Sequence, residues 1–130
     1  MSKTLLLKAE KHNWGLMRRE DWAETIWKIY SNGSYIIKEL FSPSAPGVSA
    51  KSFSTEGKLT DSEFQELKLL LDMEWSTEES QFCDGVAWSL TMYDHGTVIK
   101  QRPLGYIYGV EPYEDITLML NQLQKKKAST

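Results

Sequence analysis

Apolar and polar residues alternate most regularly in the second half of the chain. From Val86 to Met92 every second residue is large and apolar, and the residues between them are small or polar. A period of two predicts a strand with one buried face. Residues 93–96 end in glycine and predict a turn, after which Thr97–Arg102 returns as the second strand of a hairpin. Pro103-Leu104-Gly105 is expected to end that strand.

A second hairpin is predicted nearer the N-terminus. Ala23–Tyr30 and Tyr35–Phe41 are rich in residues that favour strands, and Asn32-Gly33 stands between them. Asn-Gly between two apolar runs is typical of a type I′ turn, in which both central residues take positive φ. The sequence therefore predicts that these two segments pair as antiparallel neighbours.

Three further segments have weaker strand patterns. Leu5–Ala9 is a candidate first strand, and His12-Asn13-Trp14-Gly15 is expected to break the chain after it. Val48–Phe53 follows a loop that is rich in proline and glycine, residues 42–47. Tyr106–Val110 is the third candidate and lies just before the last predicted helix.

Two segments have the 3.6-residue period of an amphipathic helix. Thr60 and Glu63 form the sequence pattern of a capping box, which marks the start of the first helix. Pro112 is expected to open the second helix, where its missing N–H costs little. The apolar stripes comprise Phe64, Leu67, Leu70, Leu71 and Trp75 in the first helix, and Ile116, Met119, Leu120 and Leu123 in the second.

This order of elements predicts an α+β fold. We expect a mostly antiparallel sheet of about five to seven strands with two amphipathic helices on one face. The order hairpin, strand, helix occurs twice, with the turns Tyr30-x-x-Gly33 and Tyr93-x-x-Gly96 in corresponding places. Duplication and coincidence both explain this similarity, because such turns are common. Residues 1–130 are expected to form a single domain with loose ends at 1–4 and 125–130.

Charge and composition narrow the classes of function. The formal net charge of −3 disfavours a nucleic-acid partner, because contacts to phosphates rely on lysine and arginine. A single cysteine, Cys83, excludes a disulfide within the chain. No segment approaches the roughly 20 apolar residues that cross a bilayer. We therefore expect a cytoplasmic protein without a membrane partner.

No catalytic or metal-binding motif is present in the sequence. The two histidines, His12 and His95, have no cysteine or second histidine at ligand spacing, so neither a metal nor another cofactor is predicted. His95 is expected to occupy a turn with unusual φ. Cys83 has no local signature of a nucleophile. Glu114-Asp115 lies where the helix dipole alone favours acidic residues. We therefore predict no enzymatic activity.

The chain is rich in aromatic residues, with 5 Trp, 6 Tyr and 4 Phe. Large aromatic side chains fill small cores, but Trp and Tyr are also enriched where proteins bind each other. Four tyrosines are the candidate binding surface: Tyr93, Tyr106, Tyr108 and Tyr113.

Two functions follow from these expectations, and the oligomeric state stays open. The first is a non-catalytic protein that binds another protein, for instance an inhibitor or immunity-type protein whose acidic surface complements a basic active site. The alternative is a module that binds a small ligand in an aromatic-lined pocket.

Overall fold

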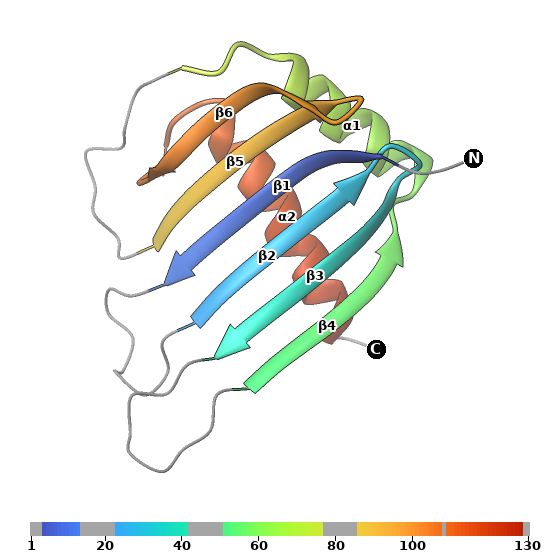
Figure 1. Cartoon of the computed structure of the whole chain (residues 1–130), viewed down its shortest axis with the longest axis vertical. Helices are drawn as coiled ribbons and strands as arrows, with labels where there is room; N and C mark the ends of the chain where they lie inside the picture. The colour runs from blue at the N-terminus through green and yellow to red at the C-terminus, as the bar shows by residue number, and fades with distance from the viewer. Residues whose placement is uncertain (1–3, 14–22, 42–50, 77–85, 108, 129–130) are drawn as a thin grey trace.

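A computed structural model describes residues 4–13, 23–41, 51–76, 86–107 and 109–128 of the chain (Figure 1). They form six strands and two helices. The strands are β1 (Leu5–Asn13), β2 (Ala23–Tyr30), β3 (Ser34–Phe41), β4 (Lys51–Lys58), β5 (Val86–Asp94) and β6 (Thr97–Gly105). The helices are α1 (Asp61–Asp72) and α2 (Tyr113–Ala128).

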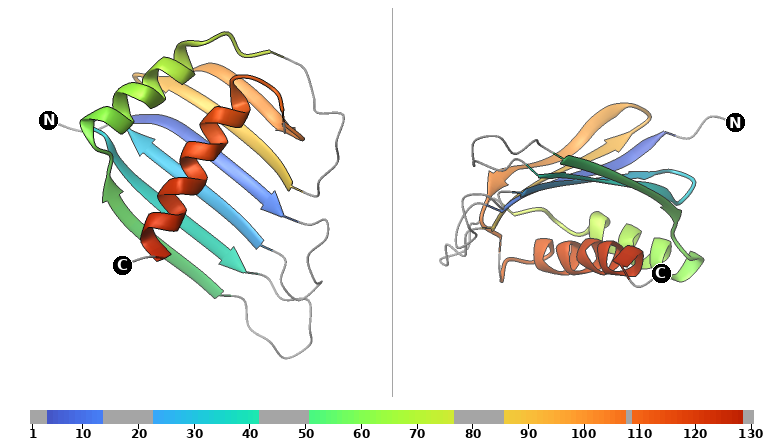
Figure 2. Two further views of the ribbon diagram at one scale, coloured as in Figure 1. Left: turned by 180° about the vertical axis from the view of Figure 1, so that it is seen from behind. Right: turned by 90° about the horizontal axis from the view of Figure 1, so that it is seen from below.

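All six strands belong to one antiparallel sheet in the order β4-β3-β2-β1-β5-β6. The first strand of the chain therefore lies in the middle of the sheet. The strands β2, β3 and β4 continue on one side of β1, and the β5–β6 hairpin lies on the other. Both helices cover the same face of the sheet, as the edge view in Figure 2 shows. The predicted α+β class, with a mostly antiparallel sheet and two helices, is confirmed.

The core lies between the sheet and the two helices. Trp27 on β2 and Trp88 on β5 stack in its centre, with 5.0 Å between ring centroids. Aliphatic side chains of the inner face of the sheet surround them: Leu7, Ala9, Ile29, Ile37 and Leu90. The helices contribute Leu67, Leu71, Ile116, Leu120 and Leu123, which belong to the stripes that the helical period predicts. Within the described residues, no helix is both long and apolar enough to cross a membrane.

The start of α1 confirms the predicted capping box. Oγ1 of Thr60 accepts a hydrogen bond from the backbone N–H of Glu63 at 3.1 Å. The side chain of Glu63 in turn accepts one from the backbone N–H of Thr60 at 2.9 Å. These reciprocal bonds satisfy two backbone donors that a helix start otherwise leaves without a partner.

Both predicted hairpins are present, but their turns differ. In the β5–β6 turn His95 has a φ of 49° and Gly96 a φ of 82°, as a type I′ turn requires. In the β2–β3 turn only Gly33 of the Asn32-Gly33 pair has a positive φ, 86°. Its N–H donates to the carbonyl oxygen of Tyr30 at 2.9 Å, and Oδ1 of Asn32 accepts from the N–H of Ser34 at 3.0 Å. The type I′ prediction for Asn32-Gly33 was therefore wrong, because the side chain of Asn32 stabilises a different turn.

Several element boundaries also differ from the predictions, and α1 ends at Asp72, before Trp75 of its predicted apolar stripe. The strand β1 continues beyond Ala9 through His12 and Asn13, where a break was predicted. The strand β6 continues through Pro103 to Gly105, since an edge strand tolerates a residue without an N–H donor. Residues 125–128, predicted to be loose, belong to α2.

In the residues that the structure describes, the second half of the chain does not repeat the order of elements of the first. A strand, β4, follows the β2–β3 hairpin, whereas the described residues between β6 and α2 contain no strand. The prediction of a strand over Tyr106–Val110 was therefore wrong for its described residues, and a hairpin-strand-helix duplication finds no support there. Of the predicted strand Val48–Phe53, residues 48–50 lie outside the described residues. The described strand, β4, starts at Lys51 and continues to Lys58, beyond the predicted end at Phe53.

Candidate functional site

The face of the sheet that points away from the helices, here called the outer face, carries the side chains that alternate with the core positions. On β1 these are Lys8, Glu10 and His12, which flank the buried Ala9 and Leu7. The residues of the neighbouring strands follow from the register: Glu24, Ile26 and Lys28 on β2, Ile36, Lys38 and Leu40 on β3, Ser52, Ser54, Glu56 and Lys58 on β4, and Ser89, Thr91 and Tyr93 on β5.

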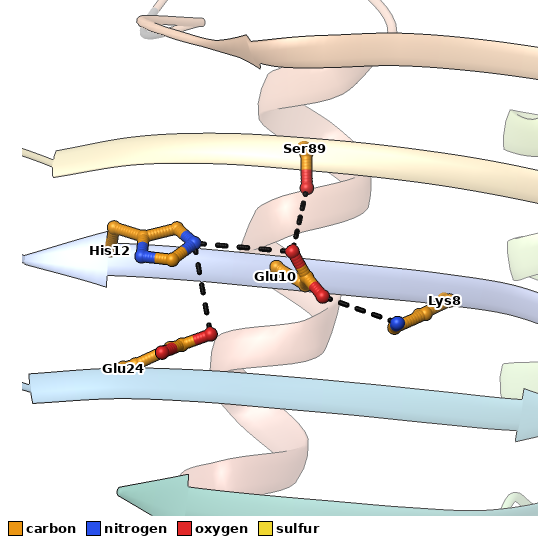
Figure 3. A network of polar contacts seen from close by, with 5 residues as sticks. All are labelled: Lys8, Glu10, His12, Glu24 and Ser89. Carbon is orange, nitrogen blue, oxygen red and sulfur yellow. Dashed lines mark hydrogen bonds and ion pairs between the residues drawn. The ribbon is translucent and has the colours of Figure 1, made fainter. Parts of the chain in front are cut away.

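Five polar side chains of three adjacent strands meet on this face, and we call them the polar cluster: Lys8, Glu10, His12, Glu24 and Ser89 (Figure 3). Register places Glu24 directly opposite His12 and Ser89 directly opposite Glu10. Directly opposed side chains lie about 5 Å apart at Cβ, so their polar ends can reach one another.

Interactions within the polar cluster connect its two carboxylates through the imidazole. Nε2 of His12 lies 3.9 Å from Oε2 of Glu10 and 3.8 Å from Oε1 of Glu24. The hydroxyl of Ser89 donates to Oε2 of Glu10 at 3.4 Å, and Nζ of Lys8 lies 3.3 Å from Oε1 of the same carboxylate. Glu10 therefore has contacts to three other members of the cluster.

The side chains of the polar cluster are partly shielded but reachable. The side chain of His12 is 17% exposed, that of Glu24 24% and that of Glu10 30%. A nitrogen and two carboxylate oxygens, one from each of these residues, lie within 4.8 Å of one another. One imidazole nitrogen and two carboxylate oxygens at these distances could hold a metal ion, and an ion could reach them from the outer face.

A groove adjoins the polar cluster on the side of β5 and β6. It has a volume of about 490 Å³ and is open to solvent. Its lining includes Lys8, Glu10 and Ser89 of the cluster. The other lining residues are Thr91, Tyr93, Val98, Gln101, Pro103 and Leu104. The groove is thus a shallow, mainly polar extension of the outer face.

The structure does not bring the four predicted binding tyrosines together on one surface. Tyr93 is half-buried and lines the groove, and Tyr106 is half-buried just after β6. Tyr108 lies outside the described residues. Tyr113 is fully buried on the helix side of the sheet, so it cannot contribute to a surface. A binding role of Tyr93 and Tyr106 stays a prediction.

Tyr113 has a structural environment that explains its burial. Its ring packs edge-on against Trp75, with 5.9 Å between centroids, and its hydroxyl donates to the carbonyl oxygen of Ser76. Burial raises the pKa of Tyr113 above 10.0, and the nearby positive charge of Arg102, 5.6 Å from the ring centroid, opposes that rise. The residue starts α2 and anchors it to the segment that follows α1.

The remaining candidate residues that the structure describes have ordinary positions. His95 occupies the β5–β6 turn with positive φ, as predicted, and its Nε2 lies 3.5 Å from Oδ1 of Asp94 at an exposed site. Cys83 lies outside the described residues. Glu114 and Asp115 are in the first turn of α2, as expected from the helix dipole.

The sequence analysis considered His12 but missed its two carboxylate neighbours, Glu10 and Glu24. The sequence does contain a pattern that places polar side chains on one face of a strand, since Lys8, Glu10 and His12 follow a period of two. Lys11 interrupts this pattern, because it is a charged residue at a position that faces the helices. There its amine lies 5.6 Å from the ring centroid of Trp88 and 3.4 Å from Oδ1 of Asn121. A long side chain can thus occupy an inner position while its charge reaches a polar partner.

Comparison of the sequence with known protein families and with characterised proteins found no match.

Proposed function

We propose that this chain is a non-catalytic binding protein that recognises another protein through the outer face of its sheet. The observation that carries the proposal is the composition of that face. Half-buried apolar side chains, Ile26, Ile36 and Leu40, lie among lysines, carboxylates and hydroxyls. Interfaces between proteins that also exist separately have this mixed character, with apolar contacts inside a polar rim.

The size of the outer face suits a protein partner. Six strands spaced about 4.8 Å apart, each about eight residues long, span roughly 700 Å². A standard interface buries about 800 Å² on each partner. The groove, in contrast, is open and polar, whereas small-ligand sites enclose about 70–90% of the ligand surface in a mainly apolar pocket.

The charges of the outer face favour a partner with charges of both signs. Lysines and carboxylates alternate along individual strands of this face, as Lys8 and Glu10 do on β1 and Glu56 and Lys58 on β4. An inhibitor of a strongly basic active site would need a predominantly acidic contact surface. The inhibitor form of the proposal rests on the net charge of −3, and the mixed outer face gives it no additional support.

Site-specific photocrosslinking in extracts of the source organism tests this proposal. A crosslinker replaces Thr91, which lines the groove, and in the matched control it replaces Gln122, which is exposed on α2. We expect a discrete protein adduct from position 91. An excess of the unmodified chain should suppress this adduct, and the charge reversal Lys28→Glu should lower its yield. Adducts of equal yield from both positions, or from position 122 alone, contradict the proposal.

The volume of the groove supports one alternative, a module that binds a small polar ligand. In that case position 91 gives no protein adduct. Instead, a screen of metabolites raises the melting temperature of the chain, and Thr91→Trp abolishes the rise by filling the groove. This outcome would mean that the outer face binds a small ligand and not a protein.

A further inference from the structure

Two adjacent strands align three metal-binding side chains at one place of the outer face. Glu10 and His12 are two residues apart on β1, so both point to the same side of the sheet. Glu24 on β2 is the direct partner of His12 in the register. The arrangement is therefore held by backbone pairing in the middle of the sheet and not by a loop.

The distances between the donor atoms are close to those around a bound metal ion. In a tetrahedral zinc site the metal–ligand bonds of about 2.0–2.2 Å place neighbouring donor atoms about 3.4 Å apart. Here Nε2 of His12 lies 3.8 and 3.9 Å from the nearer oxygens of Glu24 and Glu10. Rotation of these partly exposed side chains completes the geometry, by a contraction of about 0.5 Å in each of these two distances and by closer approach of the two carboxylate oxygens, which lie within 4.8 Å of each other.

From this arrangement we infer that Glu10, His12 and Glu24 form a site for a divalent transition ion of the zinc class. An imidazole nitrogen with two carboxylates suits zinc and its neighbours, whereas magnesium and calcium prefer ligands that are all oxygen. The inference concerns a different property from protein recognition and stands if the proposed function fails.

Two other members of the polar cluster affect the geometry and the metal affinity of this site. The hydroxyl of Ser89 donates to Oε2 of Glu10 and orients the carboxylate, as outer partners of metal ligands commonly do. The amine of Lys8, 3.3 Å from Oε1 of Glu10, places a positive charge beside the ion. Lys8 therefore opposes metal binding and keeps the affinity moderate. With three ligands from the protein, the fourth position faces the outer side of the sheet, where water or a group of a partner can occupy it.

Zinc titration of the untagged full chain tests the site. Isothermal calorimetry with Zn²⁺ is expected to give one equivalent of binding, and an excess of Mg²⁺ should not compete. His12→Ala and Glu24→Gln should each weaken binding by more than the roughly 10–100-fold that loss of an outer partner costs. His95→Ala is the matched control, since it removes the only other histidine of the chain from an exposed turn, and it should leave binding unchanged.

Lys8→Gln separates a metal site from a network of purely structural ion pairs. Removal of the competing amine should strengthen zinc binding several-fold, whereas a structural role alone predicts no gain. If a variant fails to fold, imidazole NMR of the unmodified chain decides the question, because zinc must shift the signals of His12 and not those of His95. Absence of zinc binding, equal loss in His95→Ala, or unmoved His12 signals would overturn the inference.

Discussion

The indole N–H of Trp27 donates a hydrogen bond to the backbone carbonyl oxygen of Leu120 at 2.9 Å, across 93 residues of sequence. The bond joins β2 to the middle of α2 inside the core, and both residues are fully buried. The ring of Trp27 also stacks on Trp88 of β5. A single side chain thus fixes the position of α2 along the sheet and satisfies its own polar atom there.

Trp27→Phe is expected to lower the free energy of unfolding by about 1–3 kcal/mol, because it removes a buried hydrogen bond and part of an aromatic stack. Urea unfolding followed by circular dichroism measures the change. Trp88→Phe is the control, since it alters the same stack but leaves the bond from Trp27 to Leu120 intact. Equal losses in the two variants would show that the hydrogen bond contributes little.

The parts of the fold that depend on local signals were predictable from the sequence. Thr60 and Glu63 marked the start of α1 because a capping box involves neighbouring residues only. Strict alternation marked β5 in the same way. The Asn32-Gly33 hairpin was found, but its turn type was not, because the hydrogen bond from the Ser34 N–H to the Asn32 side chain competes with type I′ geometry.

The candidate site depends on pairing between distant segments, which no local pattern contains. His12 and Glu24 become neighbours only through the register of β1 with β2. Ser89 joins them because β5, far along the chain, pairs with the other edge of β1. The strand β1 itself was predicted only as far as Ala9, since the inward-facing Lys11 interrupts the alternation. The aromatic prediction failed at Tyr113 because composition cannot distinguish a core tyrosine from a surface one.

Lys100 of β6 stabilises the end of α1. Its amine donates to the carbonyl oxygens of Leu71 at 2.7 Å and Met73 at 3.1 Å, and α1 has no basic residue in its own last turn. A cation at this pole satisfies carbonyl groups that the helix leaves without N–H partners. Lys100→Met should therefore lower the free energy of unfolding by about 1 kcal/mol.

The control for that experiment is Lys38→Met, which removes an exposed lysine from the outer face. Chemical unfolding of both variants measures the difference. A loss in Lys100→Met that does not exceed the loss in the control would contradict a capping role for Lys100.

Gly57 of β4 makes room for the ring of Tyr35 on β3, its direct partner in the register. A Cβ at position 57 would lie 2.9 Å from Cε2 of Tyr35 and closer still to Cζ and the hydroxyl. Gly57→Ala should therefore displace the ring and lower the free energy of unfolding by about 1–3 kcal/mol. Placement of an aromatic ring over a glycine on a neighbouring strand is a known device of β-sheets.

A double-mutant cycle with Tyr35→Ala tests this relationship. Once the ring is absent, Gly57→Ala should cost little or stabilise the strand, so the two changes should not be additive. Additive losses would mean that the glycine serves the backbone of β4 and not the tyrosine.

Tyr113 should make the stability of the fold sensitive to alkaline pH. Burial raises the pKa of its phenol above 10.0, whereas the unfolded chain releases this proton at the ordinary value. Above about pH 10 the unfolded state therefore binds fewer protons than the folded state, and the free energy of unfolding falls as the pH rises. The contribution is complete below pH 10 and is lost as the pH rises through the pKa of the folded state.

Tyr113→Phe isolates this effect from the other tyrosines. The variant should be less stable than the unmodified chain at neutral pH, because it lacks the hydrogen bond from Tyr113 to the carbonyl oxygen of Ser76. Its stability should then decline less steeply above pH 10. Urea unfolding at a series of pH values, with tyrosinate absorbance recorded in parallel, measures both slopes. Arg102→Gln should raise the pKa of Tyr113 further, since it removes the positive charge that opposes the effect of burial. Parallel slopes for the unmodified chain and Tyr113→Phe would contradict this prediction.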